Sequence, residues 1–239
     1  FNAIKKMNSR KYNRTYHYPF SLGATNDDRI NFDYWTDLQK IKTVVHTEKL
    51  DGENTCLNQY GVFSRSHATP TQHPWANYLK ERWALLKNDL GEIEVFGENL
   101  YAEHSIRYLN LDSHFYVFAI RHKDQWLSWE EVKFYAGVID FPTVPEIKIE
   151  SPSSSPLIEK SVLDIVKEES LFQSEDVYTG EKCAMEGLVS RNTEEFSVSD
   201  FKENVFKYVR KDHVKTDEHW SRNWKRTLLK WERGGKNAF

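Results

Sequence analysis

Short β-rich runs recur along almost the whole chain, and only a few stretches with helical spacing separate them. We expect strands at residues 44–50, 54–59, 62–66, 92–101, 115–121, 142–149, 184–191 and 203–210. A Tyr60-Gly61 turn between the second and third runs is typical of a β-hairpin. The pattern predicts a mixed α+β fold with largely antiparallel sheets flanked by helices.

Helices are expected at about 75–86, 129–138, 161–172 and 216–231, with a Ser/Pro-rich loop at 151–156. The first follows Pro74 and has apolar residues at i, i+3 and i+4 spacing. Ser128 and Glu131 form a capping-box pattern that opens the second. Asp217 and Glu218 lie in the first turn of the last, where acids favour a helix.

Length and composition favour one soluble domain over residues 1–239, since no repeat divides the 239 residues. Aromatic residues make up 14%, too many for a disordered chain. No run approaches the ~18 apolar residues of a membrane span, and the first residues lack the apolar core of a signal peptide. Cys56 and Cys183 cannot form a disulfide framework or a four-thiolate zinc site. We expect a cytoplasmic protein with no membrane partner, and a monomer by default.

The net charge of −3 is distributed unevenly. A basic N-terminal segment covers residues 1–30, and its first 17 residues contain five lysines and arginines and no acid. Between Lys202 and Lys236, eleven basic residues stand against five acidic ones. Basic ends suit a polyanionic partner, although solvated charged faces are equally common.

The tetrapeptide Lys49-Leu50-Asp51-Gly52 follows a predicted strand. A lone motif of this kind is usually an exposed strand end. The alternative is a nucleophilic lysine, whose amine attacks only when deprotonated and therefore needs a lowered pKa. Gly52 would allow a tight turn that aims the lysine tip into a pocket.

An ordered series of motifs comes after this tetrapeptide: FSRS at 63–66, FGENLY at 96–101, YVFAIR at 116–121, MEGLV at 185–189 and VFKYVRK at 205–211. Each is weak alone, but their order and spacing are specific. The series resembles the covalent nucleotidyltransferase superfamily of polynucleotide ligases and mRNA capping enzymes. Within it, the chain is most similar to ATP-dependent RNA ligases of the phage RNA-repair and RNA-editing type.

The resemblance implies an ATP-grasp-like α+β nucleotidyltransferase domain and a three-step reaction. A lysine attacks the α-phosphorus of ATP and releases pyrophosphate, leaving lysyl-AMP. The AMP moves to a 5′-phosphate of RNA, and a 3′-hydroxyl then displaces it. The implied cofactors are ATP and Mg²⁺ or Mn²⁺, and the implied partners are RNA ends or a nicked duplex. Cations are needed because each step gathers negative charge around phosphorus.

The resemblance also assigns roles to individual residues. The catalytic set is Lys49 as the nucleophile, Glu186, and Lys207, which would neutralise the α-phosphate and lower the pKa of Lys49. The nucleotide-binding set adds Glu48 (adenine edge, mainly through its backbone), Asn54, Arg65, Glu98 (ribose), Phe118 (stacking on adenine) and Lys211. Asp51 and Glu186 would hold the metal through its waters, because Mg²⁺ dehydrates reluctantly. The structural alternatives are a surface pair for Arg65, a strand-edge carboxylate for Glu98 and a core ring for Phe118.

The last motif departs from the family's usual K-x-K pattern. Here Lys207 is followed by Tyr208 and Val209, and then by Arg210 and Lys211. On a strand, positions 207, 209 and 211 share one face while 210 points away. Lys211 therefore substitutes for the missing lysine, or the register is shifted to 209 and 211.

Two further groups of residues carry little weight. The histidines, including His67, His104 and His213, show no metal-binding spacing, so surface or core roles are favoured. The rings of Trp220, Trp224 and Trp231 would line one face of the last helix, which favours packing over base stacking.

The candidate functions differ in the length of chain they require after the last motif. DNA ligases and capping enzymes carry a further β-barrel domain there, and the 28 residues after Lys211 are too few for one. We therefore expect no trailing OB barrel. The alternative function is an ATP-dependent DNA ligase, or a nick-sealing ligase with DNA in its substrate. A non-catalytic nucleic-acid-binding module is disfavoured because Lys49, Glu98 and Glu186 are all present.

Overall fold

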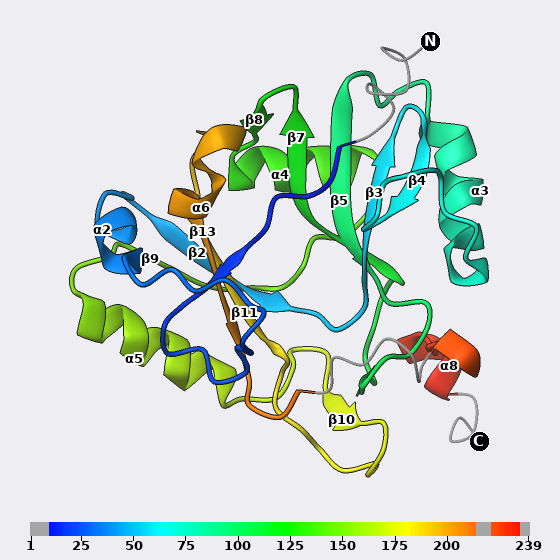
Figure 1. The fold of residues 1–239 in the computed structure, drawn as a ribbon. Helices are drawn as coiled ribbons and strands as arrows, with labels where there is room; N and C mark the ends of the chain where they lie inside the picture. The colour runs from blue at the N-terminus through cyan, green and yellow to red at the C-terminus, as the bar shows by residue number, and fades with distance from the viewer. Residues whose placement is uncertain (1–9, 214–220, 235–239) are drawn as a thin grey trace.

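The computed structural model describes residues 10–213 and 221–234. Two large β-sheets form its centre, and helices pack around them (Figure 1). One sheet has the strand order β1-β13-β11-β2-β9, the other β12-β8-β7-β5-β3-β4, and a small sheet pairs β10 with β6. The mixed α+β prediction is confirmed, and the strands of the described residues form no closed barrel.

The strands are β1 Tyr16–His17, β2 Val44–Lys49, β3 Glu53–Asn58, β4 Gly61–Ser64, β5 Ile93–Asn99, β6 Ile106–Tyr108, β7 Phe115–His122, β8 Gln125–Trp126, β9 Glu146–Glu150, β10 Ser174–Asp176, β11 Gly187–Asn192, β12 Phe196–Ser197 and β13 Val205–Val209. Within the described ranges, every pair of these strands is antiparallel except β1–β13. The antiparallel prediction therefore holds for both large sheets.

The helices are α2 Tyr34–Leu38, α3 Asn77–Leu86, α4 Trp129–Val138, α5 Ser155–Val166, α6 Phe201–Asn204 and α8 Lys230–Arg233, with 3₁₀ turns at Pro74–Ala76 and Val198–Asp200. The capping box is confirmed: Ser128 accepts from Glu131 N, and the Glu131 carboxylate accepts from Ser128 N. No helix in the described part of the chain is long and apolar enough to cross a membrane.

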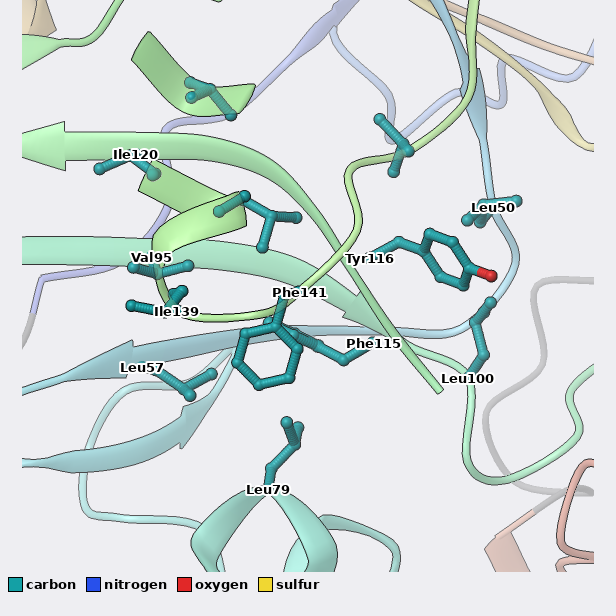
Figure 2. Packing of buried hydrophobic residues seen from close by; sticks show 14 of the residues in the cluster. Leu50, Leu57, Leu79, Val95, Leu100, Phe115, Tyr116, Ile120, Ile139 and Phe141 are labelled. Atoms are coloured by element: carbon teal, nitrogen blue, oxygen red, sulfur yellow. The ribbon is translucent and has the colours of Figure 1, made fainter. Parts of the chain in front are cut away.

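The largest hydrophobic core lies on one face of the second sheet (Figure 2). Leu57 and Val95 project from β3 and β5, and Leu79 of α3 and Phe141 after α4 cover them. The core continues to Leu50, directly after β2. Burial of these side chains, each worth roughly 1.5–3 kcal/mol, therefore fixes the chain next to Lys49.

The helix expected over 161–172 is misplaced. Helix α5 begins at Ser155, inside the stretch that composition predicts to be a loop. Ser154 caps it by accepting a hydrogen bond from Leu157 N, and Pro156 lies in its first turn, where a missing N–H costs nothing. The Ser/Pro-rich stretch is therefore a helix start, and the helix ends at Val166.

The helix expected over 216–231 is largely absent from the described residues of this range. Residues 216–220 lie outside the described residues, and residues 223–229 are not helical. Their backbone pairs elsewhere: Arg226 forms a bridge with Ala102, and Thr227 N donates to Tyr101 O. Tertiary pairing has thus overridden the local helical pattern over residues 223–229, between the helical residues 221–222 and helix α8.

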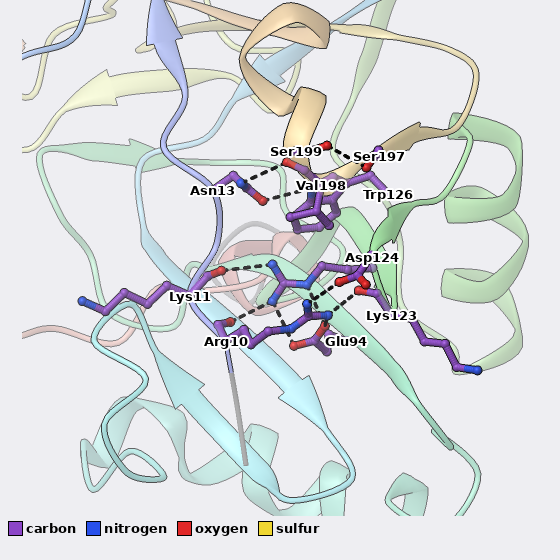
Figure 3. A network of polar contacts seen from close by, with 11 residues as sticks. Arg10, Lys11, Asn13, Glu94, Lys123, Asp124, Trp126, Ser197, Val198 and Ser199 are labelled. Carbon is purple, nitrogen blue, oxygen red and sulfur yellow. Dashed lines mark hydrogen bonds and ion pairs between the residues drawn. The ribbon is translucent and has the colours of Figure 1, made fainter. Parts of the chain in front are cut away.

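The N-terminal segment is tied to the second sheet by a polar network (Figure 3). The guanidinium of Arg121, 2% exposed, makes two bonds of 2.6 and 2.9 Å to Glu94. It also donates to the backbone carbonyls of Arg10 and Lys11. The Arg10 side chain also forms ion pairs with Glu94 and Asp124, so one charge of the basic segment is engaged within the protein.

Candidate active site

Lys49 and Glu186 meet at the ends of two neighbouring strands. The antiparallel register pairs Lys49, the last residue of β2, with Gly187, the first residue of β11. Glu186 directly precedes Gly187, and Lys49 Nζ donates to its Oε1 over 2.6 Å. The lysine side chain is 29% exposed and the glutamate side chain 6%. A partly exposed lysine side chain therefore contacts a nearly buried carboxylate.

Carboxylates control the protonation of this amine. Burial alone would lower the pKa of Lys49, but the carboxylates of Glu186, Glu98 and Asp51 outweigh it and raise the pKa above its ordinary value. This direction is opposite to the lowered pKa that a nucleophilic amine needs, because the charged groups that act on Lys49 most strongly are acids.

The turn after β2 is fixed by hydrogen bonds to Asp51 and Gly52. Asp51 Oδ2 accepts from Ser105 N at 2.9 Å, Ser105 Oγ at 2.7 Å and Ile106 N at 3.0 Å. A Cβ on Gly52 would lie 2.5 Å from the backbone oxygen of Asn99, so this close approach requires glycine. The Asp51 carboxylate is therefore held in place through Oδ2.

Glu98 lies on β5, opposite Asn54 of β3 in the register. Glu98 Oε1 accepts from Gly52 N at 3.1 Å. Burial raises the pKa of Glu98 to about 8, and nearby acids add to this while Lys49 opposes it. The Oδ1 atom of Asn54 is buried and has no hydrogen-bond partner among the described residues. Glu98 and Asn54 thus lie on adjacent strands of the second sheet, and Glu98 contacts the turn after Lys49.

His213 belongs to this site, although its sequence context favoured a surface or core role. Arg210 N donates to Glu186 O just past β13, and the left-handed Asp212 (φ 60°) then reverses the chain. His213 Nε2 lies 3.4 Å from Asp51 Oδ1 and 3.5 Å from Glu186 Oε1. No spacing motif announces this contact, because it depends on where β13 ends and how the chain turns.

Glu48 points to the opposite side of β2 from Lys49. Its carboxylate accepts from Ser170 Oγ at 2.7 Å and from Leu171 N at 2.8 Å. Burial raises the pKa of Glu48 to about 7, and these hydrogen bonds oppose the rise. The side chain therefore ties β2 to the segment after α5.

Phe118 occupies a β-bulge. Phe96 pairs with Ala119 and Gly97 with Val117, so Phe118 is the extra residue on β7. A bulge changes the direction in which a side chain points. The Phe118 ring is only partly buried, and it packs edge-to-face with the Tyr12 ring at a centroid distance of 5.2 Å. Phe118 is therefore neither a fully buried core ring nor a free surface ring.

Lys207 and Lys211 occupy different environments. Lys207 lies within β13, opposite Val189 of β11, on the sheet face that also carries Lys49. Strand β13 ends at Val209, and Lys211 is exposed in the following turn. The expected alternation through 207, 209 and 211 is therefore wrong at its last position, because the strand does not extend that far.

Arg65 lies exposed directly after β4. Among the described residues, its guanidinium makes no hydrogen bond or ion pair, and only its backbone oxygen is engaged, by His67. The structure thus brings Lys49, Asp51, Glu98 and Glu186 together, whereas Arg65 and Lys211 stand outside this group.

The cluster has the donor set of a cation site. Ligand atoms of Asp51, Glu186 and His213 all lie within 4.8 Å of one another. Glu186 Oε2 is buried without a hydrogen-bond partner in the described part of the chain. A bound cation would satisfy this atom, so the residues present fit a divalent metal.

Solved RNA ligases share this fold. An alanine variant of Naegleria gruberi RNA ligase with ATP and Mn superposes with a TM-score of 0.52 at 16% identity, over 84% of this chain and 61% of that one. An apo form of another alanine variant of that ligase gives 0.52 at 17% identity, over 85% and 59%. An archaeal ATP-dependent RNA ligase gives 0.50 at 12% identity, over 84% and 48%. The chain thus spans about half to three-fifths of the proteins it resembles.

The sequence profile described as RNA ligase matches residues 42–209. This range extends from just before β2 to the end of β13 and contains most of the site. The chain belongs to the RNA ligase family. No curated protein sequence matches it significantly.

Proposed function

We propose that this chain is the adenylyltransferase domain of an ATP-dependent RNA ligase that joins 5′-phosphate and 3′-hydroxyl RNA ends through lysyl-AMP. The observation that carries the proposal is the contact of Lys49 with Glu186, between Asp51 and Glu98, on an RNA ligase fold. The proposed partners are single RNA ends or a nicked duplex.

Lys49 is the proposed nucleophile. Its amine would form the N–P bond to the α-phosphorus of ATP while the bond to the β-phosphate oxygen breaks and pyrophosphate leaves. The amine must first lose a proton, and Glu186 Oε1 at 2.6 Å is the group placed to receive it. A divalent cation on the acidic cluster would offset its negative charge, lower the pKa of Lys49 and polarise the phosphate.

The remaining residues would position the nucleotide. Phe118, re-aimed by its bulge, would stack on adenine, and the Glu48 backbone would meet the edge of the base. Glu98 would accept from the ribose hydroxyls, and Asn54, opposite it on β3, would lie near the α-phosphate with its amide nitrogen as the donor. Lys207 would neutralise the phosphate from β13, on the far side of β11 from Lys49.

The two lysines of the last motif should differ sharply in their effect. Lys207→Ala should slow protein–AMP formation by roughly 10- to 150-fold, the equivalent of one charged hydrogen bond of ~1.5–3 kcal/mol. Lys211→Ala should leave the rate nearly unchanged, because Lys211 is exposed beyond the strand. Single-turnover labelling with ATP measures both rates, and the reverse ranking would show that the turn folds back onto the nucleotide.

The choice of polymer is tested with nicked duplexes that differ only in the last two sugars on the 3′-hydroxyl side. Ribonucleotides there should be sealed much faster than deoxynucleotides, because the 2′-hydroxyl is the group that distinguishes the two sugars. The 3′-hydroxyl must also be aligned with the activated phosphate at ~3–3.5 Å. Equal sealing rates would favour the DNA-ligase alternative and would leave the Lys49 chemistry unaffected.

A further inference from the structure

We propose that residues 221–234, here called the C-terminal segment, form a docking surface for a single-stranded stretch of RNA next to its reacting end. This segment lies beyond residues 42–209, the range that matches the RNA ligase profile. The choice of RNA as the partner rests on the proposed function. The surface itself rests on the anchoring, charge and exposure of the segment.

The C-terminal segment is fixed beside the turn that follows Lys49. Thr227 N donates to Tyr101 O over 2.8 Å, just beyond the end of β5 (Figure 1). Tyr101 comes two residues after Asn99, whose backbone oxygen closely approaches Gly52 in that turn. Because consecutive Cα atoms are 3.8 Å apart, Tyr101 lies within about 8 Å of Asn99. The segment therefore borders the candidate site, where the nucleotides near a reacting RNA end would lie.

Positive charge is concentrated in the C-terminal segment. It contains five basic residues and one acid, Glu232. The basic residues are Arg222, Lys225, Arg226, Lys230 and Arg233. The side chains of Arg222 and Lys225 are exposed and make no hydrogen bond or ion pair within the described part of the chain. These two cations can therefore contact phosphates without breaking an internal contact.

Flat side chains lie among these charges. Trp231 of α8 is 60% exposed. The Arg226 guanidinium lies over the Tyr101 ring, 5.5 Å from its centroid, and the arginine side chain is 40% exposed. Unpaired bases stack on aromatic rings and on guanidinium planes. The segment thus offers two faces for stacking in addition to its cations.

This combination favours an unpaired strand over a duplex. Cations alone would suit the backbone of either form, because both carry a phosphate at every nucleotide. Within a duplex the bases stack on one another, whereas in a single strand they are free to stack on side chains. An exposed indole among cations is therefore typical of single-strand binding. Such binding tolerates any sequence, because every base has a π-face.

The charges are tested by the binding of a 5′-phosphorylated single-stranded RNA of ~15 nucleotides to the full chain, without ATP or metal, followed by fluorescence anisotropy. Arg222→Ala combined with Lys225→Ala should weaken binding about 10- to 30-fold at ~0.1 M salt. The slope of log affinity against log salt should become shallower by about 1.4, because each phosphate contact on a single strand contributes ~0.7.

The matched control is Lys40→Ala combined with Lys42→Ala. It removes the same charge from exposed positions just after α2, which lies on the opposite side of the molecule from α8 (Figure 1). Charges this far from the bound strand are largely screened by salt, so the affinity should change less than about threefold. Equal losses in the two double variants would mean that net charge rather than this surface binds RNA, and would overturn the proposal.

Trp231→Ala separates stacking from charge. It should weaken RNA binding about 5- to 150-fold, the effect of one stacked base, and leave the salt slope unchanged. Trp231→Phe should restore part of the affinity. The matched control is Phe134→Ala, which removes a ring of similar exposure, 64%, from α4 and should bind RNA like the unmodified protein. Unchanged affinity in Trp231→Ala would overturn the proposal.

Photo-cross-linking of the unmodified protein decides the question even where a variant does not fold. RNA that carries 4-thiouridine should cross-link within residues 221–234, as located by fragmentation of the protein. Cross-links confined to other parts of the chain would overturn the proposal.

The two proposals fail separately. A protein that cross-links RNA within the C-terminal segment but never forms an AMP adduct would refute the proposed function and retain the surface. A protein that forms the adduct and seals RNA, but whose cross-links all lie outside the segment, would refute the surface alone.

Discussion

Replacing Lys49 with arginine should abolish the ATP-dependent sealing of RNA. Arginine keeps the positive charge beside Glu186, but its guanidinium stays protonated and cannot attack phosphorus. The loss should exceed 10³-fold, because no other group replaces a positioned amine nucleophile. Gel analysis of 5′-phosphate RNA incubated with ATP and Mn²⁺ measures the effect.

A pre-adenylylated RNA separates chemistry from folding in this variant. In the last step a 3′-hydroxyl displaces AMP from the RNA end, and no lysine amine is consumed. Lys49→Arg should therefore still join such an RNA, at a reduced rate, without ATP. A variant that seals 5′-phosphate RNA with ATP at the unmodified rate would place the nucleophile elsewhere.

Replacing Arg121 with methionine should cost about 3 kcal/mol of the free energy of unfolding, the lower end for a broken buried pair, because the nearly buried Glu94 then keeps only its ion pair with the half-exposed Arg10. The change also removes the donors to the Arg10 and Lys11 carbonyls and releases the N-terminal segment (Figure 3). Urea unfolding followed by tryptophan fluorescence gives the value.

The matched control is Arg10→Met, which removes the exposed member of the same network. Arg10 is 43% exposed, and one of its partners, Asp124, is largely exposed as well. Exposed ion pairs contribute ~0–1 kcal/mol, so this variant should lie near the unmodified protein. Equal losses in both variants would mean that the anchoring of the segment, rather than the buried pair, carries the stability.

Local sequence patterns were sufficient to predict most of the strands and two of the site residues, Lys49 and Glu186. Alternation and turn residues located β2 to β5, and the capping box located α4, since these signals act within a few residues. The motif order identified Lys49 and Glu186, and the antiparallel register explains why residues so distant in sequence touch.

The features that sequence could not supply depend on tertiary structure. His213 reaches Asp51 and Glu186 because β13 stops at Val209 and a left-handed residue turns the chain. The same early end leaves Lys211 exposed. The segment 223–229 pairs with the chain around Tyr101 and gives up its helical pattern. None of these outcomes has a local signature, since each is decided by a distant partner.

The central claim is that Lys49 becomes covalently linked to AMP, and intact-protein mass spectrometry tests it most directly. After incubation with ATP and Mn²⁺, the protein should gain about 329 Da, the mass of one AMP less water. Fragmentation should locate this mass on the peptide that contains Lys49. The absence of any gain, or an adduct on a different residue, would contradict the account.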